Sequence, residues 1–202
     1  MPQTTASPEC VFCCRREQPA ALFETPSFYI MPDKFPMQPG HTLVISKQHL
    51  ACLAVAPAAA LEELDAAAER VRRFLEAAYG LPVLALENGI TGQTVFHAHL
   101  HLMPLMPLPL PRHVLEHPDV WLVDGWEEVR EHFARHGNYR YLEQSGQRLL
   151  VAGHSLAISA LRDSLAQATG LAFGPDGWIK TTMPEDVLEA GRRWGKWLDE
   201  SG

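Results

Sequence analysis

Residues 96–103 have the sequence Phe-His-Ala-His-Leu-His-Leu-Met, in which imidazole and apolar side chains alternate. Successive side chains of a β-strand point to opposite faces of the sheet. Three histidines would therefore share one face of a strand here: His97, His99 and His101. Because burying imidazoles without partners is costly, we expect the apolar face to pack on the core and the histidine face to line a site.

Three interpretations of this alternation compete. The histidines could be polar residues on the wet face of a sheet. They could chelate a catalytic metal, which needs a further ligand nearby, and no Asp or Glu lies between Gly89 and Arg112. They could also supply a nucleophile, because neutral imidazole exists near pH 7 and attacks readily. The sequence favours the third interpretation.

The first half of the chain alternates between strand and helix patterns. Apolar residues at steps of three and four predict a helix over 56–79, with Gly80 just beyond its end. Runs of β-branched and apolar residues predict strands over 22–24, 28–31, 41–46, 82–86 and 93–103. This order predicts an α+β fold.

Residues 104–111 contain four prolines in eight positions and cannot form a central strand. They predict a stiff connector between a domain over 1–111 and an extension of unassigned role over 112–202. In this smaller α/β region we expect helices over 125–136, 155–168 and 184–199 and a hairpin over 139–152.

The composition limits the class of protein. The 202 residues are 47% hydrophobic and 20% charged, and their formal net charge is −7. An acidic chain gives no support for binding long nucleic acid, although backbone amides could still hold a small anion. No apolar run approaches the roughly 18 residues of a membrane helix, and the N-terminus lacks a secretory pattern. We therefore expect a cytoplasmic protein that does not enter membranes.

The segment Gly92-Gln-Thr-Val-Phe-His-Ala-His-Leu-His-Leu-Met103 resembles the signature of the histidine-triad family, His-φ-His-φ-His-φ-φ, where φ is apolar. Upstream, Pro39-Gly-His-Thr-Leu-Val-Ile-Ser-Lys-Gln-His49 resembles a second motif of the family. The resemblance covers about residues 9–107. It implies an antiparallel sheet with one long helix, and it implies a homodimer.

The resemblance also implies an enzyme that cleaves nucleoside phosphates at the α-phosphorus, with His99 attacking to form a nucleotidyl intermediate. A dinucleoside polyphosphate or a nucleoside phosphoramidate would be the substrate, and water or another acceptor would complete hydrolysis or transfer. A nucleotide-binding adaptor with little turnover is the alternative.

Family roles carry over to particular positions. The resemblance implies that His101 contacts the phosphate and that Gln93 lies near the leaving-group oxygen. The implied substrate-binding residues are Asp33, for the ribose, and Asn88, Gly92 and Thr94, for the phosphate. Simpler interpretations stay open: a turn at Asn88-Gly89, a plain strand residue at 94 and a turn-capping Asp at 33.

Cys10 and Cys13 have the C-x₂-C spacing of half a zinc site. The resemblance implies that His49 and His97 complete the site as a closed, structural one, which leaves His99 as the nucleophile. Reduced cysteines without a metal are the alternative, and a Cys10–Cys13 disulfide does not suit the cytoplasm.

Overall fold

The computed structural model describes residues 7–15, 18–90, 92–153, 155, 157–171, 173–174, 177–178 and 184–201. The helices are α1 (Val11–Cys14), the 3-10 turn η1 (Leu53–Val55), α2 (Ala58–Tyr79), α3 (Arg112–Leu115), α4 (Trp126–His136), α5 (Ala157–Thr169) and α6 (Pro184–Ser201). The strands are β1 (Phe23–Glu24), β2 (Phe28–Pro32), β3 (Thr42–Ser46), β4 (Val83–Glu87), β5 (His99–Pro104), β6 (Val120–Leu122), β7 (Arg140–Gln144), β8 (Gln147–Val151), β9 (Phe173–Gly174) and β10 (Gly177–Trp178).

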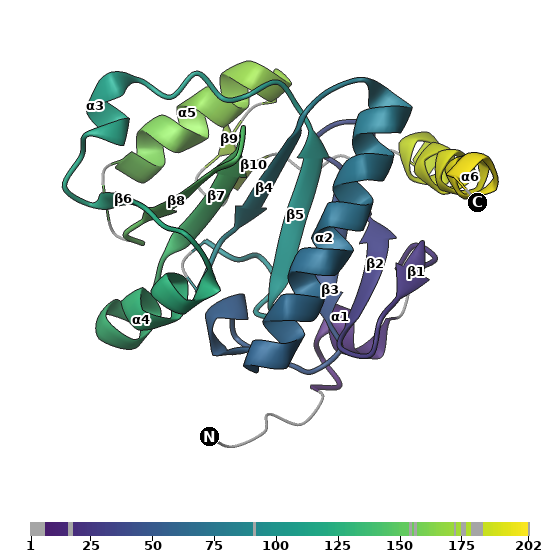
Figure 1. Ribbon diagram of the computed structural model, residues 1–202, viewed down its shortest axis with the longest axis horizontal. Helices are drawn as coiled ribbons and strands as arrows, with labels where there is room; N and C mark the ends of the chain where they lie inside the picture. Colours follow the sequence, from purple (N-terminus) through teal and green to yellow (C-terminus); the bar gives the residue numbers. More distant parts are fainter. Residues whose placement is uncertain are drawn as a thin grey trace.

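Eight of these strands form one antiparallel sheet in the order β1-β2-β3-β5-β4-β7-β8-β6 (Figure 1). The predicted α+β class and the antiparallel sheet with one long helix are confirmed. Strand β5 lies between β3 and β4, with Ile45 opposite His99 and Leu86 opposite His101. The histidine strand is therefore central in the sheet.

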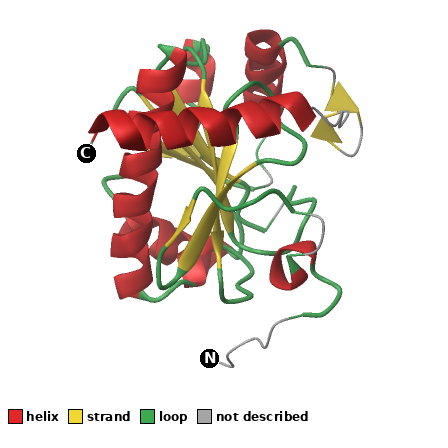
Figure 2. Cartoon of the chain, turned by 90° about the vertical axis from the view of Figure 1, so that its right-hand side faces the viewer, coloured by secondary structure: helices red, strands yellow, loops and turns green. Residues whose placement is uncertain are grey.

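Helix α2 covers one face of the sheet (Figure 1). Its buried residues recur every three or four positions and include Leu64, Val71 and Leu75. Gly80 ends the helix in a left-handed conformation with φ +68°, which glycine adopts without steric cost. In Figure 2, α6 crosses α2, where Trp194 packs against Phe74 with ring centroids 5.0 Å apart.

The histidine face carries two smaller apolar clusters. One joins Phe12 of α1 to residues of β2 and β3, including Tyr29 and Leu43. The other joins α5 to strands β7 and β8, where Leu161 belongs to the same cluster as Leu142 and Leu149. Helices α1 and α5 therefore lie on the face opposite α2.

The strand predicted over 93–103 is wrong at its start, because β5 begins only at His99. Residues 93–98 form a loop that follows Gly92, whose φ of +89° is incompatible with an extended ladder. His97 therefore lies outside the strand, although the backbone of Ala98 still pairs with Ser46 and Leu50.

Strands from the predicted extension continue the sheet of the first half. Strand β7 pairs with β4, with Glu87 opposite Tyr141. The main core includes Trp126, Tyr139 and Leu150 together with residues of α2. The division at residues 111 and 112 stays a prediction. Among the described residues, no helix is both long and apolar enough to cross a membrane.

Candidate functional site

His99 has one ring nitrogen engaged by its own backbone segment. Its Nδ1 lies 2.6 Å from the carbonyl oxygen of His97, an acceptor, so Nδ1 carries the proton and donates it. The imidazole is 6% exposed and packs edge-on against Phe12 at a centroid distance of 5.2 Å. In the neutral ring this tautomer leaves the lone pair on Nε2, the form a nucleophile needs.

His101 is held by His41, a residue whose role the sequence alone did not indicate. Nδ1 of His41 accepts a hydrogen bond of 3.1 Å from the amide of Met37, and burial lowers the pKa of His41. Neutral His41 therefore carries its proton on Nε2, which lies 2.9 Å from Nδ1 of His101. This bond leaves the proton of His101 on Nε2, where it can be donated to a ligand.

A pocket of about 470 Å³, including its open mouth, lies against the two catalytic candidates His99 and His101. Its wall includes Phe12, Asp33 and Thr94. Asp33 also caps the turn, because its Oδ1 accepts the amide of Phe35 at 2.8 Å.

The expected phosphate-binding residues fall partly inside this pocket. Thr94 lines it, and Asn88 lies buried directly after β4. The side-chain amide of Gln93 donates to the carbonyl oxygens of Ala51, at 2.9 Å, and of Gly89. Gln93 is not among the residues that line the pocket. Its side chain therefore ties the loop after β4 to the loop before η1.

Next to the pocket, four thiol and imidazole groups converge: Cys10, Cys13, His49 and His97. Their ligand atoms all lie within 4.8 Å of one another. Nδ1 of His97 is 3.4 Å from Sγ of Cys10 and 3.2 Å from Nδ1 of His49. A tetrahedral zinc ion with ordinary bond lengths would separate sulfur and nitrogen ligands by about 3.6 Å and two nitrogens by about 3.3 Å. The four side chains therefore fit a metal ion.

The remaining nitrogen of His97 is also fixed. Its Nε2 lies 2.7 Å from the carbonyl oxygen of Ser46, so Nε2 donates and the lone pair is on Nδ1, toward the cysteines. Burial lowers the pKa of His97 to about 4, which keeps it neutral at pH 7. A hydrogen bond from the far nitrogen is the usual way in which proteins orient a histidine ligand.

A second group of candidate metal ligands consists of Asp33, His41 and His101. Two of its nitrogens are hydrogen-bonded to each other, Nε2 of His41 and Nδ1 of His101. These nitrogens face one another, so this group fits a proton-ordered pair better than a metal site.

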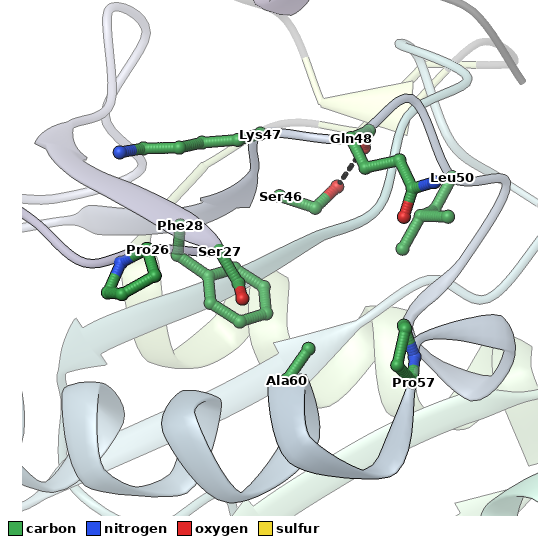
Figure 3. A pocket seen from close by; sticks show the side chains of 9 residues that line it. All are labelled: Pro26, Ser27, Phe28, Ser46, Lys47, Gln48, Leu50, Pro57 and Ala60. Carbon is green, nitrogen blue, oxygen red and sulfur yellow. Dashed lines mark hydrogen bonds between the residues drawn. The ribbon is translucent and has the colours of Figure 1, made fainter. Parts of the chain in front are cut away.

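Another hollow lies between the β2–β3 edge and the start of α2 (Figure 3). None of the nine side chains drawn there is a histidine, a cysteine or a carboxylate. Its one charged residue, Lys47, pairs with Glu24 at 2.9 Å. Ser46 and Gln48 are hydrogen-bonded within the segment itself. The charge of this hollow is therefore already engaged in an ion pair.

The comparisons with known proteins agree with this geometry. The HIT domain family model matches residues 15–108. An uncharacterised HIT-like protein of Mycobacterium tuberculosis is 36% identical over 101 residues, which are 47% of this chain and 70% of the relative. The chain belongs to the HIT, or histidine-triad, family.

Further relatives match about half of the chain. The adenylylsulfatase HINT3 of Arabidopsis thaliana is 30% identical over 107 residues, 50% of this chain and 54% of that protein. Among solved structures, a zinc-bound histidine-triad family protein from Mycobacterium smegmatis is 32% identical, covering 48% of this chain and 74% of that chain at a TM-score of 0.42.

Proposed function

We propose that this protein is a nucleotide hydrolase or nucleotidyl transferase that cleaves a nucleoside phosphate compound at its α-phosphorus. The observation that carries the proposal is the tautomer of His99. Its Nδ1 is committed to the carbonyl of His97, and the ring borders a pocket that also contains Asp33 and Thr94. Dinucleoside polyphosphates and nucleoside phosphoramidates are the proposed substrates.

In the proposed reaction, the lone pair on Nε2 of His99 attacks the α-phosphorus, and the bond from phosphorus to the leaving group breaks with its electron pair. The leaving group takes up a proton from solvent as it departs, and the acceptor of the second step returns one to solvent. Water or another acceptor then displaces the imidazole, which restores His99 and releases the nucleotide. Two moderate steps replace one difficult displacement.

The other residues would stabilise the negative charge on the phosphate or position the substrate. Nε2–H of His101, oriented by His41, would donate to a phosphate oxygen as negative charge develops there. The backbone of Gly92 and the hydroxyl of Thr94 would add donors, with Asn88 supporting their loop. Asp33 would accept from the ribose hydroxyls. Gln93 would act through the loop that it ties down.

We further propose that Cys10, Cys13, His49 and His97 bind one zinc ion. Four protein ligands close the coordination sphere, so the ion would be structural. It would hold α1, and therefore Phe12, against the pocket. No catalytic step passes through it.

The first experiment measures turnover of diadenosine tetraphosphate, adenosine 5′-phosphoramidate and a nucleotide sugar by wild type and by His99→Asn. We expect wild type to cleave at least one of them and His99→Asn to cleave none while unfolding at the same temperature. His113→Asn, at an exposed position, is the matched control and should keep full activity. Turnover that survives in His99→Asn would refute the mechanism.

The alternative is a nucleotide-binding adaptor with little turnover, in which residues 112–202 carry the main role. It predicts that folded wild type binds a nucleotide with micromolar affinity and cleaves none of the panel. The ordered Nε2 of His99 favours the enzyme, because a binder has no need of a nucleophile.

A further inference from the structure

Arg140 is a buried cation that the predicted extension brings to the histidine face. It begins β7 and is 9% exposed. Burial lowers the pKa of its guanidinium only to about 10, so the group stays charged at pH 7.

The register of the sheet places Arg140 relative to His99. Leu86 lies opposite His101 on β5 and opposite Leu142 on β7. Because paired residues point to the same face and this pattern repeats every two residues, Arg140 shares the face of His99. If both pairings of β4 are continued by two residues, Asn88 lies between His99 and Arg140. The two backbones are therefore about 10 Å apart, two strand spacings.

The side chain of Arg140 reaches from there to the loop in front of β5. A Cβ added at Gly92 would lie 2.5 Å from Nη2 of Arg140. The guanidinium therefore covers Gly92, the residue whose amide is assigned to the phosphate. A side chain at position 92 would have to displace the end of the Arg140 side chain, and the φ of +89° also favours glycine there.

Arg140 and the pocket lie on opposite sides of His99. Phe12, Asp33 and Leu43 line the pocket and come from α1 and the β2–β3 side of β5. Strands β4 and β7 lie on the other side of β5. With the nucleoside in the pocket and the α-phosphorus at His99, the leaving group extends toward β4 and β7.

We propose that Arg140 binds the leaving group of the substrate and selects leaving groups that are themselves oxyanions, a phosphate or sulfate joined to the α-phosphorus through oxygen. A planar guanidinium suits such groups, because it donates two parallel hydrogen bonds to their oxygens. This inference rests on the proposed function and makes its substrate class more specific. The amine leaving group of a phosphoramidate offers Arg140 no such acceptor.

The test compares kcat/KM for adenosine 5′-phosphosulfate, diadenosine tetraphosphate and adenosine 5′-phosphoramidate, which share one nucleotidyl half. We expect wild type to prefer the first two. In Arg140→Gln, kcat/KM should fall at least about tenfold for a substrate with an oxyanionic leaving group and less than about threefold for the phosphoramidate. Arg140→Lys should restore part of the loss. If kcat/KM in Arg140→Gln falls further for adenosine 5′-phosphosulfate, sulfate is the preferred leaving group. If it falls further for diadenosine tetraphosphate, phosphate is preferred.

Arg148→Gln is the matched control. It removes a guanidinium from the same hairpin, but Arg148 pairs with Glu143 and Asp65 on the face that α2 covers. Its substrate preference should equal that of wild type. Equal losses on all substrates in Arg140→Gln, or a wild type that prefers the phosphoramidate, would overturn the proposal.

A binding measurement separates this inference from the proposed function. If wild type cleaves nothing, the proposed function fails, and titration calorimetry with ADP and AMP then decides the role of Arg140. Tighter binding of ADP than of AMP that is lost in Arg140→Gln supports a site for the second phosphate. A ratio of ADP to AMP affinity that is unchanged in Arg140→Gln refutes such a site. If Arg140→Gln does not fold, the ratio in wild type decides, and equal affinities for ADP and AMP refute the site.

Discussion

Single residues set the arrangement of protons at the site. The amide of Met37 fixes the tautomer of His41, and His41 in turn fixes that of His101. The first contact lies within the loop before β3. The second joins two residues that are 60 positions apart in the sequence. Their effect is to present an N–H of His101 and a lone pair of His99 on the same face.

His41→Phe keeps the ring volume but removes the bond to His101. We expect kcat/KM to fall by about tenfold, the equivalent of one lost hydrogen bond of ordinary strength. Stability should fall by about 1–3 kcal/mol, because the buried amide of Met37 also loses its acceptor. His41→Gln, which keeps a donor, should recover most of the loss. Steady-state kinetics and a pH–rate profile measure both, and an unchanged profile in His41→Phe would count against the orientation of His101 by His41.

Glu87 is a fully buried carboxyl between Tyr139, which donates its hydroxyl, and the amide of Leu53, 2.7 Å away. Burial raises its pKa from 4.5 to about 7. The folded state therefore keeps this proton to a higher pH than the unfolded state does. The contribution of Glu87 to stability is complete below about pH 4.5 and declines as the pH rises to about 7.

Glu87→Gln should remove this dependence on pH. Between pH 5 and pH 8, we expect wild type to lose on the order of 3 kcal/mol more unfolding free energy than Glu87→Gln loses. Urea unfolding of both proteins at the two pH values measures the difference. Parallel pH dependence in the two proteins would show that Glu87 ionises normally.

At the scale of elements, α1 is too short to be stable alone. It has four residues and no side-chain cap. The hydroxyl of Tyr29 donates to the carbonyl of Phe12, and Phe12 packs on the β2–β3 side of the sheet. The cysteines on either side of Phe12 would add the proposed zinc ion as its main anchor.

Cys13→Ser should therefore lose the metal and loosen α1. We expect wild type to contain one zinc per chain and the variant none, with an unfolding temperature lower by about 10 °C, the equivalent of about 3 kcal/mol in a chain of this size. Cys14→Ser, one residue along but outside the cluster, is the control and should keep its zinc. Elemental analysis and calorimetry test this, and equal zinc contents would refute the ligand set.

The whole molecule shares one sheet and one main core across the predicted boundary. The indole of Trp126 stacks on Tyr141 at 4.8 Å and donates to Asp65 of α2 at 3.0 Å. This side chain joins α4, β7 and α2, so we expect the two predicted parts to unfold together. The predicted homodimer stays a prediction. Strand β7 of the same chain already pairs with β4, and β1 and β6 form the two ends of the sheet.

Trp126→Ala should destabilise the whole chain by about 3–5 kcal/mol, because it removes a large buried ring and leaves Asp65 without its donor. We expect one cooperative transition in both proteins, seen by calorimetry and by circular dichroism. Two separate transitions, with only one shifted by the substitution, would support independent domains over 1–111 and 112–202.

Local patterns in the sequence determined much of the molecule. The helix expected over 56–79 is present as Ala58–Tyr79, and the hairpin expected over 139–152 is present as β7 and β8. The alternation of His99 and His101 with leucines holds on β5. Each of these depends on periodicity or turn chemistry within a few residues, which the chain carries wherever it folds. The start of β5 was mispredicted, because Gly92 and the loop contacts of Gln93 override a strand-like pattern.

Only the tertiary structure decided which distant residues meet. The sequence gives no order for the strands, so it could not predict that β7 pairs with β4 and carries Arg140 to Gly92. It also could not predict that His41 orients His101, or that Tyr139 closes over Glu87. Strand order and loop contacts follow from burying apolar faces of segments far apart in the chain, and no local pattern records that choice.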